Sequence, residues 1–284
     1  MQQRRITETM TNQTRRKFFR DLGLGAAAFS IAAERGKASQ MPGRPPSGAA
    51  GSSAAGPSNI MVIAAHPGDA FFAMGAPVAL QIHLGGQGNF LSLSLGEKGS
   101  STIPSARYGI LQREASRRAA DMLAARTSFL TYPDGEIPVN DEAKFAVCDL
   151  IREYKPDIIV THWRVSWHKD HKACYEIVND AVFYATLPSV VRKQPAHAVA
   201  KVFFADNWED ANDFKADTYL DITPVFQHWF DACATFPMWR GENGFRYNDY
   251  YGSLAVERGC LSGSKYAVAL MSPPEQLTRH VRAL

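Results

Sequence analysis

The sequence predicts an α/β fold: a doubly wound, mostly parallel β-sheet with helices on both of its faces. Three observations lead to this prediction. From residue 59 onward, short apolar runs alternate with longer amphipathic runs. The short runs have the length and β-branched content of buried strands, and the longer ones have the length and period of helices. Strand–helix alternation at this spacing is typical of parallel strands, because each return connection needs a crossover.

The expected elements follow one another in the order that this fold requires. Apolar runs predict strands at residues 60–65, 90–95, 128–131, 157–161 and 201–205. Amphipathic runs predict helices at residues 71–84, 108–125, 141–154 and 172–185. Beyond about residue 206 aromatic residues are frequent and few clear periods remain, so no element is assigned there.

The first 38 residues have the plan of an export signal. Arg15-Arg16-Lys17 precedes an apolar run at residues 22–33, which is too short to cross a bilayer because a span needs about 20 residues. Gly36-Lys37-Ala38 then offers small residues of the kind that a signal peptidase recognises. The paired arginines resemble a twin-arginine signal peptide, so we expect residues 1–38 to be removed and the mature protein to be periplasmic or secreted. A chance basic N-terminus is the alternative.

Residues 39–58 are almost entirely Gly, Ala, Ser and Pro, which predicts a flexible linker ahead of one domain at residues 59–284. No later run is apolar enough for a membrane anchor in the mature form. The chain has 31 basic and 28 acidic residues, and removing residues 1–38 leaves 23 basic against 25 acidic. The remainder of the chain is thus nearly neutral and has no basic stripe, which argues against a nucleic-acid partner.

One carboxylate stands alone in the apolar N-terminal part of the domain. Asp69 is the only Asp, Glu, Lys or Arg between residues 59 and 96, and it lies three residues after His66 in the turn His66-Pro67-Gly68-Asp69. A carboxylate in such surroundings must be paired, hydrogen-bonded or metal-bound, because leaving it unpaired costs several kcal/mol. A role as N-cap of the helix that follows is the structural alternative.

A second polar cluster follows the strand expected at residues 157–161. His162, His168 and His171 lie within ten residues, with Asp170 beside the last of them. Residues 168 and 171 would share a face on the first turn of a helix. Both clusters would lie at carboxyl ends of parallel strands, where open α/β sheets build their sites.

Two histidines and one carboxylate with an open position form a common catalytic zinc set. His66, Asp69 and His171 could supply it. His168 would then be free for proton transfer or for stabilising an oxyanion, with Asp170 fixing its tautomer. The structural alternative is that hydrogen bonds and ion pairs within the protein satisfy all these groups without a metal.

Together the motifs resemble those of the PIG-L/LmbE-like zinc deacetylases. That family carries Ala-His-Pro-Asp-Asp after its first strand and His-x-Asp-His about a hundred residues later. This chain has Ala65-His66-Pro67-Gly68-Asp69 and His168-Lys169-Asp170-His171. The resemblance spans about residues 59–270. Its further matching segments are Leu95-Gly96-Glu97-Lys98-Gly99, Arg113-Glu114, Tyr132-Pro133-Asp134-Gly135, Lys155-Pro156-Asp157 and Glu257-Arg258-Gly259.

The resemblance implies a Rossmann-like, LmbE-like fold and a zinc-dependent hydrolase that removes an N-acyl group, usually acetyl, from an amino sugar or glycoconjugate. The partner would then be a small-molecule or glycan substrate. It also implies one zinc per chain, held by His66, Asp69 and His171, which polarises the amide carbonyl and activates water. His168, backed by Asp170, would stabilise or protonate the tetrahedral intermediate.

One departure from the family bears on activity. Gly68 stands where the family has its general-base Asp, and general-base assistance is typically worth about 10²–10⁴ in rate. His168, Glu97 or Asp134 could serve as the base, or the metal could act largely unaided on a more reactive substrate. The other alternative is a non-catalytic or weakly active metal- and carbohydrate-binding protein on a degenerate scaffold.

Two further features concern the substrate. Val268 stands where the family often has glutamate, so the resemblance implies no substrate contacts for this region of the chain. Trp163 and Trp167 flank the second motif, where an indole could stack on a sugar ring or pack in the core.

Overall fold

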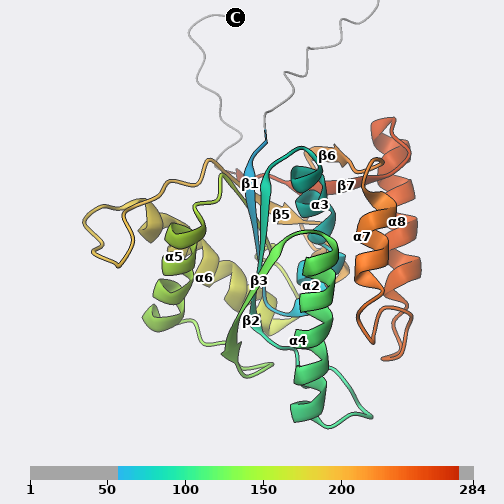
Figure 1. Cartoon of the computed structure of the whole chain (residues 1–284), viewed down its shortest axis with the longest axis horizontal. Coiled ribbons are helices and arrows are strands. Elements are labelled where there is room, and N and C mark those ends of the chain that lie inside the picture. The colour runs from blue at the N-terminus through green and yellow to red at the C-terminus, as the bar shows by residue number, and fades with distance from the viewer. Residues whose placement is uncertain (1–56, 275–284) are drawn as a thin grey trace, which may run out of the picture. The chain divides into compact units, whose positions relative to one another are not determined.

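A computed structural model describes residues 57–274 and places a seven-stranded sheet at their centre (Figure 1). The strand order is β3-β2-β1-β4-β5-β7-β6. The first five strands of the chain pair in parallel, whereas β7 runs antiparallel to β5 and β6, so the predicted mostly parallel α/β sheet is confirmed. The strands are β1 (Asn59–Ala64), β2 (Gln87–Ser94), β3 (Arg126–Tyr132), β4 (Ile158–Thr161), β5 (Lys201–Ala205), β6 (Thr218–Asp221) and β7 (Ala267–Met271).

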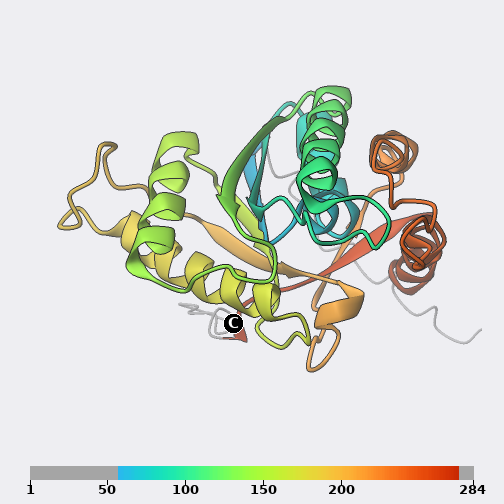
Figure 2. The same cartoon turned by 90° about the horizontal axis from the view of Figure 1, so that it is seen from below.

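Helices cover both faces of this sheet (Figures 1 and 2). The helices α5 (Asp141–Tyr154) and α6 (Lys169–Thr186) pack together on one face. The opposite face carries α2 (Pro67–Phe72), α3 (Gly75–His83), α4 (Ser105–Met122), α7 (Phe226–Cys233) and α8 (Tyr247–Ser262). A short 3-10 turn, η1 (Trp208–Asp210), follows β5.

The sequence of β1 is a continuous apolar run because both faces of this strand are buried. Ile60 and Val62 are buried in the core beneath α2, α3 and α4, whereas Met61 and Ile63 are buried in the core beneath α5 and α6. Successive side chains of a strand point to opposite faces. A central strand covered on both sides therefore needs apolar residues at every position, which is typical of parallel sheets.

The order of the strands fixes where the two polar motifs meet. Val62 of β1 pairs with Phe90 of β2 on one side and with Val160 of β4 on the other. The chain thus winds outward to β3 and then returns across β1 to build the other half of the sheet. Such a reversal opens a crevice at the carboxyl ends of the strands, between the segments that follow β1 and β4.

The helix expected at residues 71–84 is two helices in the structure, α2 and α3. Proline inside a helix clashes with the carbonyl four residues earlier, which for Pro77 is that of Ala73. Restarting the helix at Gly75 puts Pro77 in the first turn, where proline is tolerated. Asp69 is not an N-cap, because α2 begins after His66 and Asp69 lies in its first turn.

The remaining boundaries differ from expectation by a few residues, and the segment beyond residue 206 holds η1, β6, α7, α8 and β7. The expected signal peptide at residues 1–38 and nearly all of the expected linker lie outside the described residues. No helix within residues 57–274 combines the length and the apolar content of a membrane span.

Arg152 of α5 generates the first testable prediction. Its buried guanidinium donates five hydrogen bonds to backbone carbonyls of Ala185, Val190, Gln194, Tyr184 and Leu187. Replacing Arg152 with Leu leaves these carbonyls without a donor, so the free energy of unfolding should fall by about 3 kcal/mol or more. Urea unfolding followed by circular dichroism measures it.

The exposed Arg117 of α4 offers the matched control. Arg117→Leu should change the free energy of unfolding by less than about 0.5 kcal/mol. Equal stability of Arg152→Leu and Arg117→Leu would contradict the role given to the buried guanidinium.

Candidate metal centre and active site

The turn after β1 holds His66 and Asp69 side by side. Pro67 occupies the first position of α2, where its fixed φ favours an immediate helix start. The helical turn brings Nδ1 of His66 to 3.0 Å from Oδ2 of Asp69. The other oxygen of Asp69 accepts a hydrogen bond from Nδ2 of Asn207 at 3.3 Å.

The start of α6 adds His171 from the neighbouring strand connection. Its Nε2 lies 3.2 Å from the same Oδ2 of Asp69, so that oxygen sits between nitrogens of two histidines. The structure therefore brings together the three residues that the sequence predicted as metal ligands.

The tautomer of His171 is set by Asp210. Nδ1 of His171 lies 2.8 Å from Oδ1 of Asp210, and a hydrogen bond to this carboxylate places the proton on Nδ1. Nε2 is buried and makes no hydrogen bond with a described residue. A carboxylate behind an imidazole whose other nitrogen is free is the usual support of a metal-binding histidine.

The spacing of these donor atoms fits a metal ion. Ligand atoms about 2.0–2.1 Å from a tetrahedral zinc lie about 3.3 Å from one another, and the two separations given above are 3.0 and 3.2 Å. Burial lowers the pKa of His171, but Asp69 and Asp210 outweigh burial and raise it to about 10. The local charge thus favours a cation, which a proton or a metal ion can supply.

Among the described residues, three overlapping groups of side chains are close enough to hold an ion: His66, His168 and His171; Asp69, His162 and His171; and His66, Asp134 and Asp170. His162 has no free nitrogen, because Nε2 accepts the backbone N–H of Ala65 at 3.1 Å and Nδ1 donates to Asp210 at 2.8 Å. It therefore acts as a structural histidine beside the site.

The carboxylate of Asp170 corrects one expectation. It does not pair with His168; instead Oδ2 lies 3.3 Å from Nε2 of His66 and accepts the backbone N–H of Gly135 at 2.6 Å. Oδ1 of Asp134 lies 3.2 Å from the same His66 nitrogen. Two carboxylates thus orient His66 so that its Nδ1 faces Asp69.

His168 is the N-cap of α6, and its Nδ1 accepts the backbone N–H of Asp170 at 3.2 Å. Burial, followed by the neighbouring His66 and His171, lowers the pKa of His168 to about 4. A neutral ring that accepts at Nδ1 carries its proton on Nε2. His168 is therefore a hydrogen-bond donor to the pocket, which suits an oxyanion better than it suits a base.

The residues considered as substitutes for the missing base are engaged elsewhere. Oε1 of Glu97 accepts the backbone N–H of Asp134 at 2.8 Å, and Glu97 does not line the pocket. Asp134 lines it, but Oδ2 accepts the N–H of Lys98 and Oδ1 contacts His66. Gly68 lines the pocket too, and a Cβ there would come no nearer than 3.3 Å to Phe72.

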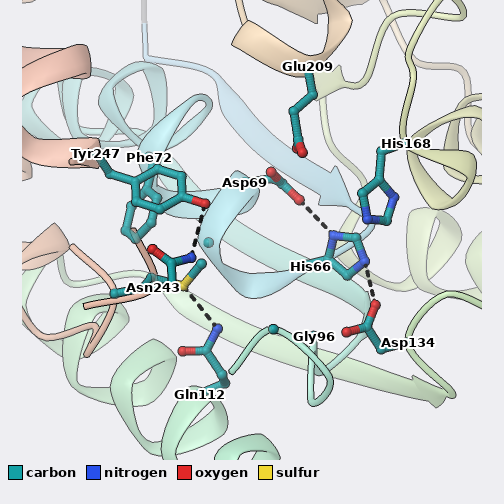
Figure 3. A pocket seen from close by; sticks show the side chains of 13 residues that line it. His66, Asp69, Phe72, Gly96, Gln112, Asp134, His168, Glu209, Asn243 and Tyr247 are labelled. Carbon is teal, nitrogen blue, oxygen red and sulfur yellow. Dashed lines mark hydrogen bonds and ion pairs between the residues drawn. The ribbon is translucent and has the colours of Figure 1, made fainter. Parts of the chain in front are cut away.

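Above these groups lies a pocket of about 140 Å³ (Figure 3). One wall is apolar and includes Phe72 and Met238, while the polar wall carries His66, Asp69 and His168. Glu209 points into the pocket from the side opposite Asp134 (Figure 3). Among the described residues that line it there is no lysine or arginine, so the pocket is acidic.

Three site residues belong to none of the predicted motifs: Asn207, Glu209 and Asp210. All three follow β5 directly, at the same edge of the sheet as the two motifs. The rule that sites form at the carboxyl ends of parallel strands would have indicated this segment. Its polar residues are grouped as Asp206-Asn207-Trp208-Glu209-Asp210.

A profile of the family described as PIG-L, GlcNAc-PI de-N-acetylase, matches residues 61–182, which contain both motifs. Residues 61–182 of this chain are thus similar to the PIG-L family. The PIG-L resemblance inferred from the motifs is thus confirmed.

Similar proteins of the PIG-L type carry different activities in their names. The chain is 24% identical to the 4-oxalmesaconate hydratase of Pseudomonas putida over 213 residues, covering 70% of this chain and 79% of that protein. It is 22% identical to the diacetylchitobiose deacetylase of Thermococcus kodakarensis over 227 residues, covering 76% and 83%.

A solved structure shows the same fold. The 4-carboxy-2-hydroxymuconate hydratase from Pseudomonas putida KT2440 superposes with a TM-score of 0.72 at 21% identity, covering 80% of this chain and 99% of that one. The PIG-L fold is thus common to deacetylases and a hydratase, and the activity of this chain must be argued from its own site.

The ligand set generates the second prediction. Replacing His171 with Ala removes a nitrogen from the proposed centre, so zinc bound per chain should fall from close to one to a small fraction of that. Inductively coupled plasma mass spectrometry after gel filtration measures the zinc content.

His228→Ala is the matched control, since His228 is exposed on α7 and should leave the zinc content unchanged. Full zinc occupancy in His171→Ala would contradict the assignment.

Proposed function

We propose that this chain is an exported, zinc-dependent hydrolase that removes an N-acyl group, foremost N-acetyl, from an amino sugar or glycoconjugate. One observation carries the proposal: the free, buried Nε2 of His171 and Nδ1 of His66 both face Asp69 at the floor of an open pocket. Export is proposed from the sequence of residues 1–38 alone.

The charge of the pocket supports a neutral acyl substrate. Asp69, Asp134 and Glu209 line it, and none of its described lining residues is a lysine or arginine. A polycarboxylate acid, such as the substrate class named for the hydratase relatives, would meet these carboxylates with no lysine or arginine beside them. A neutral amide fits better, and the ammonium group released by its hydrolysis is attracted to carboxylates.

The roles of the residues follow from their contacts. His66, Asp69 and His171 would hold Zn²⁺, which supplies a Lewis acid that polarises a carbonyl oxygen and lowers the pKa of water. His168 donates its Nε2–H toward the oxygen that gains negative charge when the amide carbon is attacked. Asp134 and Asp170 keep His66 in place, and Asp210 does the same for His171.

The apolar wall fits the acyl end of the substrate. Phe72 and Met238 face the polar groups across the pocket and would exclude water around a small acyl chain. The small volume of this pocket suits an acetyl group rather than a whole sugar, so the sugar would lie at the mouth.

An aromatic side chain lies where that sugar would be expected. Trp163 is buried in the core, as the structural interpretation predicted, but Trp167 is 64% exposed and adjacent to His168. Its ring is 5.8 Å from that of Trp208, which precedes Glu209. Exposed indole faces beside a site commonly stack against apolar faces of ligands.

Gly68 favours a second candidate, a binding protein of the same fold with little or no turnover. The two candidates differ in one observable: the hydrolase releases acetate from N,N′-diacetylchitobiose or N-acetylglucosamine, whereas the binding protein retains the intact ligand. Loss of the ultraviolet absorbance of an unsaturated acid, without acetate release, would instead indicate a hydratase.

The third prediction concerns His168. Replacing it with Ala removes the proposed donor, so kcat for acetate release should fall about 10²–10³-fold. KM and zinc content should change little, because His168 is not among the three proposed ligands. An unchanged kcat would remove His168 from the mechanism.

The fourth prediction concerns the sugar. Trp167→Ala should raise KM for N,N′-diacetylchitobiose about 3- to 10-fold, from the ~0.5–1.5 kcal/mol that an aromatic contact contributes. Trp167→Phe should restore part of the loss. An N-acetylated amine without a sugar ring should be hydrolysed equally by all three proteins, and a KM increase for that amine as well would contradict the stacking role.

A further inference from the structure

We propose that Glu209 is a fourth protein ligand of the metal held by His66, Asp69 and His171. The inference rests on the proposed metal centre and assigns it a second carboxylate, supplied by η1. None of the motifs in the sequence analysis includes this residue.

Geometry is the first support. Oε2 of Glu209 lies 3.4 Å from Nε2 of His171, on which Oδ2 of Asp69 also converges at 3.2 Å. These distances match the spacing of about 3.3 Å expected between ligands of one tetrahedral ion. Figure 3 shows the Glu209 carboxylate directed toward Asp69 from the side of the pocket opposite Asp134.

The second support is that Glu209 has no other partner. Its side chain is only 13% exposed, and its carboxylate accepts no hydrogen bond from a described residue. A second carboxylate, that of Asp69, shares the same pocket. Both carboxylates converge on one imidazole, which carries at most a single positive charge, whereas a divalent ion would satisfy both of them.

The backbone holds Glu209 in this position. Its N–H donates to Oδ1 of Asn207 at 3.1 Å, and its carbonyl accepts from Oγ of Ser166 at 3.1 Å and from the N–H of Trp167 at 3.3 Å. The next residue, Asp210, orients His171. One short turn thus contributes both a ligand and the support of another ligand.

A fourth ligand changes what the centre favours. Two neutral histidines with two carboxylates balance the charge of a divalent ion, whereas the three-residue set leaves one positive charge. The balanced centre has less attraction for an anionic substrate, which agrees with the absence of lysine and arginine among the described residues of the pocket.

The test measures metal binding rather than turnover. Glu209→Gln keeps the size of the side chain but removes its charge, so the Kd for zinc, from competition with a chromogenic chelator, should rise at least tenfold. The visible absorption of the cobalt-substituted full chain should also change, because the ligand set changes. Glu176→Gln, exposed on α6, is the matched control and should keep the wild-type Kd and spectrum.

A wild-type Kd and an unaltered cobalt spectrum in Glu209→Gln would overturn the proposal and leave Glu209 as a pocket wall or a base. Thermal unfolding of the metal-free variant separates loss of a ligand from loss of the fold: it should be at least as stable as the wild type, because an unpaired buried charge is gone. A metal-free variant that does not fold would also count against the assignment. If Glu209→Gln loses zinc affinity as predicted but the zinc-loaded wild type releases no acetate, the proposed function alone is contradicted.

Discussion

The site depends on one buried carboxylate, that of Asp210. It is 1% exposed, and its two oxygens each lie 2.8 Å from Nδ1 of a histidine, His162 and His171. Burial would raise the pKa of this carboxyl, but the two histidines lower it well below its usual value. A charged acceptor at this point sets the tautomers of both rings, so one nitrogen of His162 is left to anchor Ala65 and one of His171 is left for the pocket.

This arrangement joins three segments that are far apart in the sequence. The hydrogen bond from Ala65 to His162 links the end of β1 to the segment after β4, and Asp210 links both to the segment after β5. The strand order makes the meeting possible, because β1, β4 and β5 are neighbours with carboxyl ends at one edge. Polar groups buried there support one another, and their apolar surroundings make each contact stronger than it would be in water.

Much of this could be predicted from the sequence. The apolar run of β1 and the β-branched β4 predict their strands, and a lone Asp69 in apolar surroundings indicates a charge that needs a partner. The spacing of His168 and His171 then places two imidazoles near it. Contacts between distant segments could not be predicted: Asp170 faces His66 rather than His168, and the carboxylates of Glu209 and Asp210 contact His171 from the turn after β5. Local patterns report on neighbours in the chain, whereas these contacts depend on strand order.

X-ray absorption at the zinc K-edge, on the full chain loaded with one equivalent of zinc, tests the central claim most directly. The account predicts scattering from two imidazole rings together with nitrogen and oxygen ligands at about 2.0–2.2 Å, and no sulfur. A sulfur shell near ~2.3 Å, or a shell of oxygen alone without imidazole scattering, would place the metal elsewhere and contradict the account.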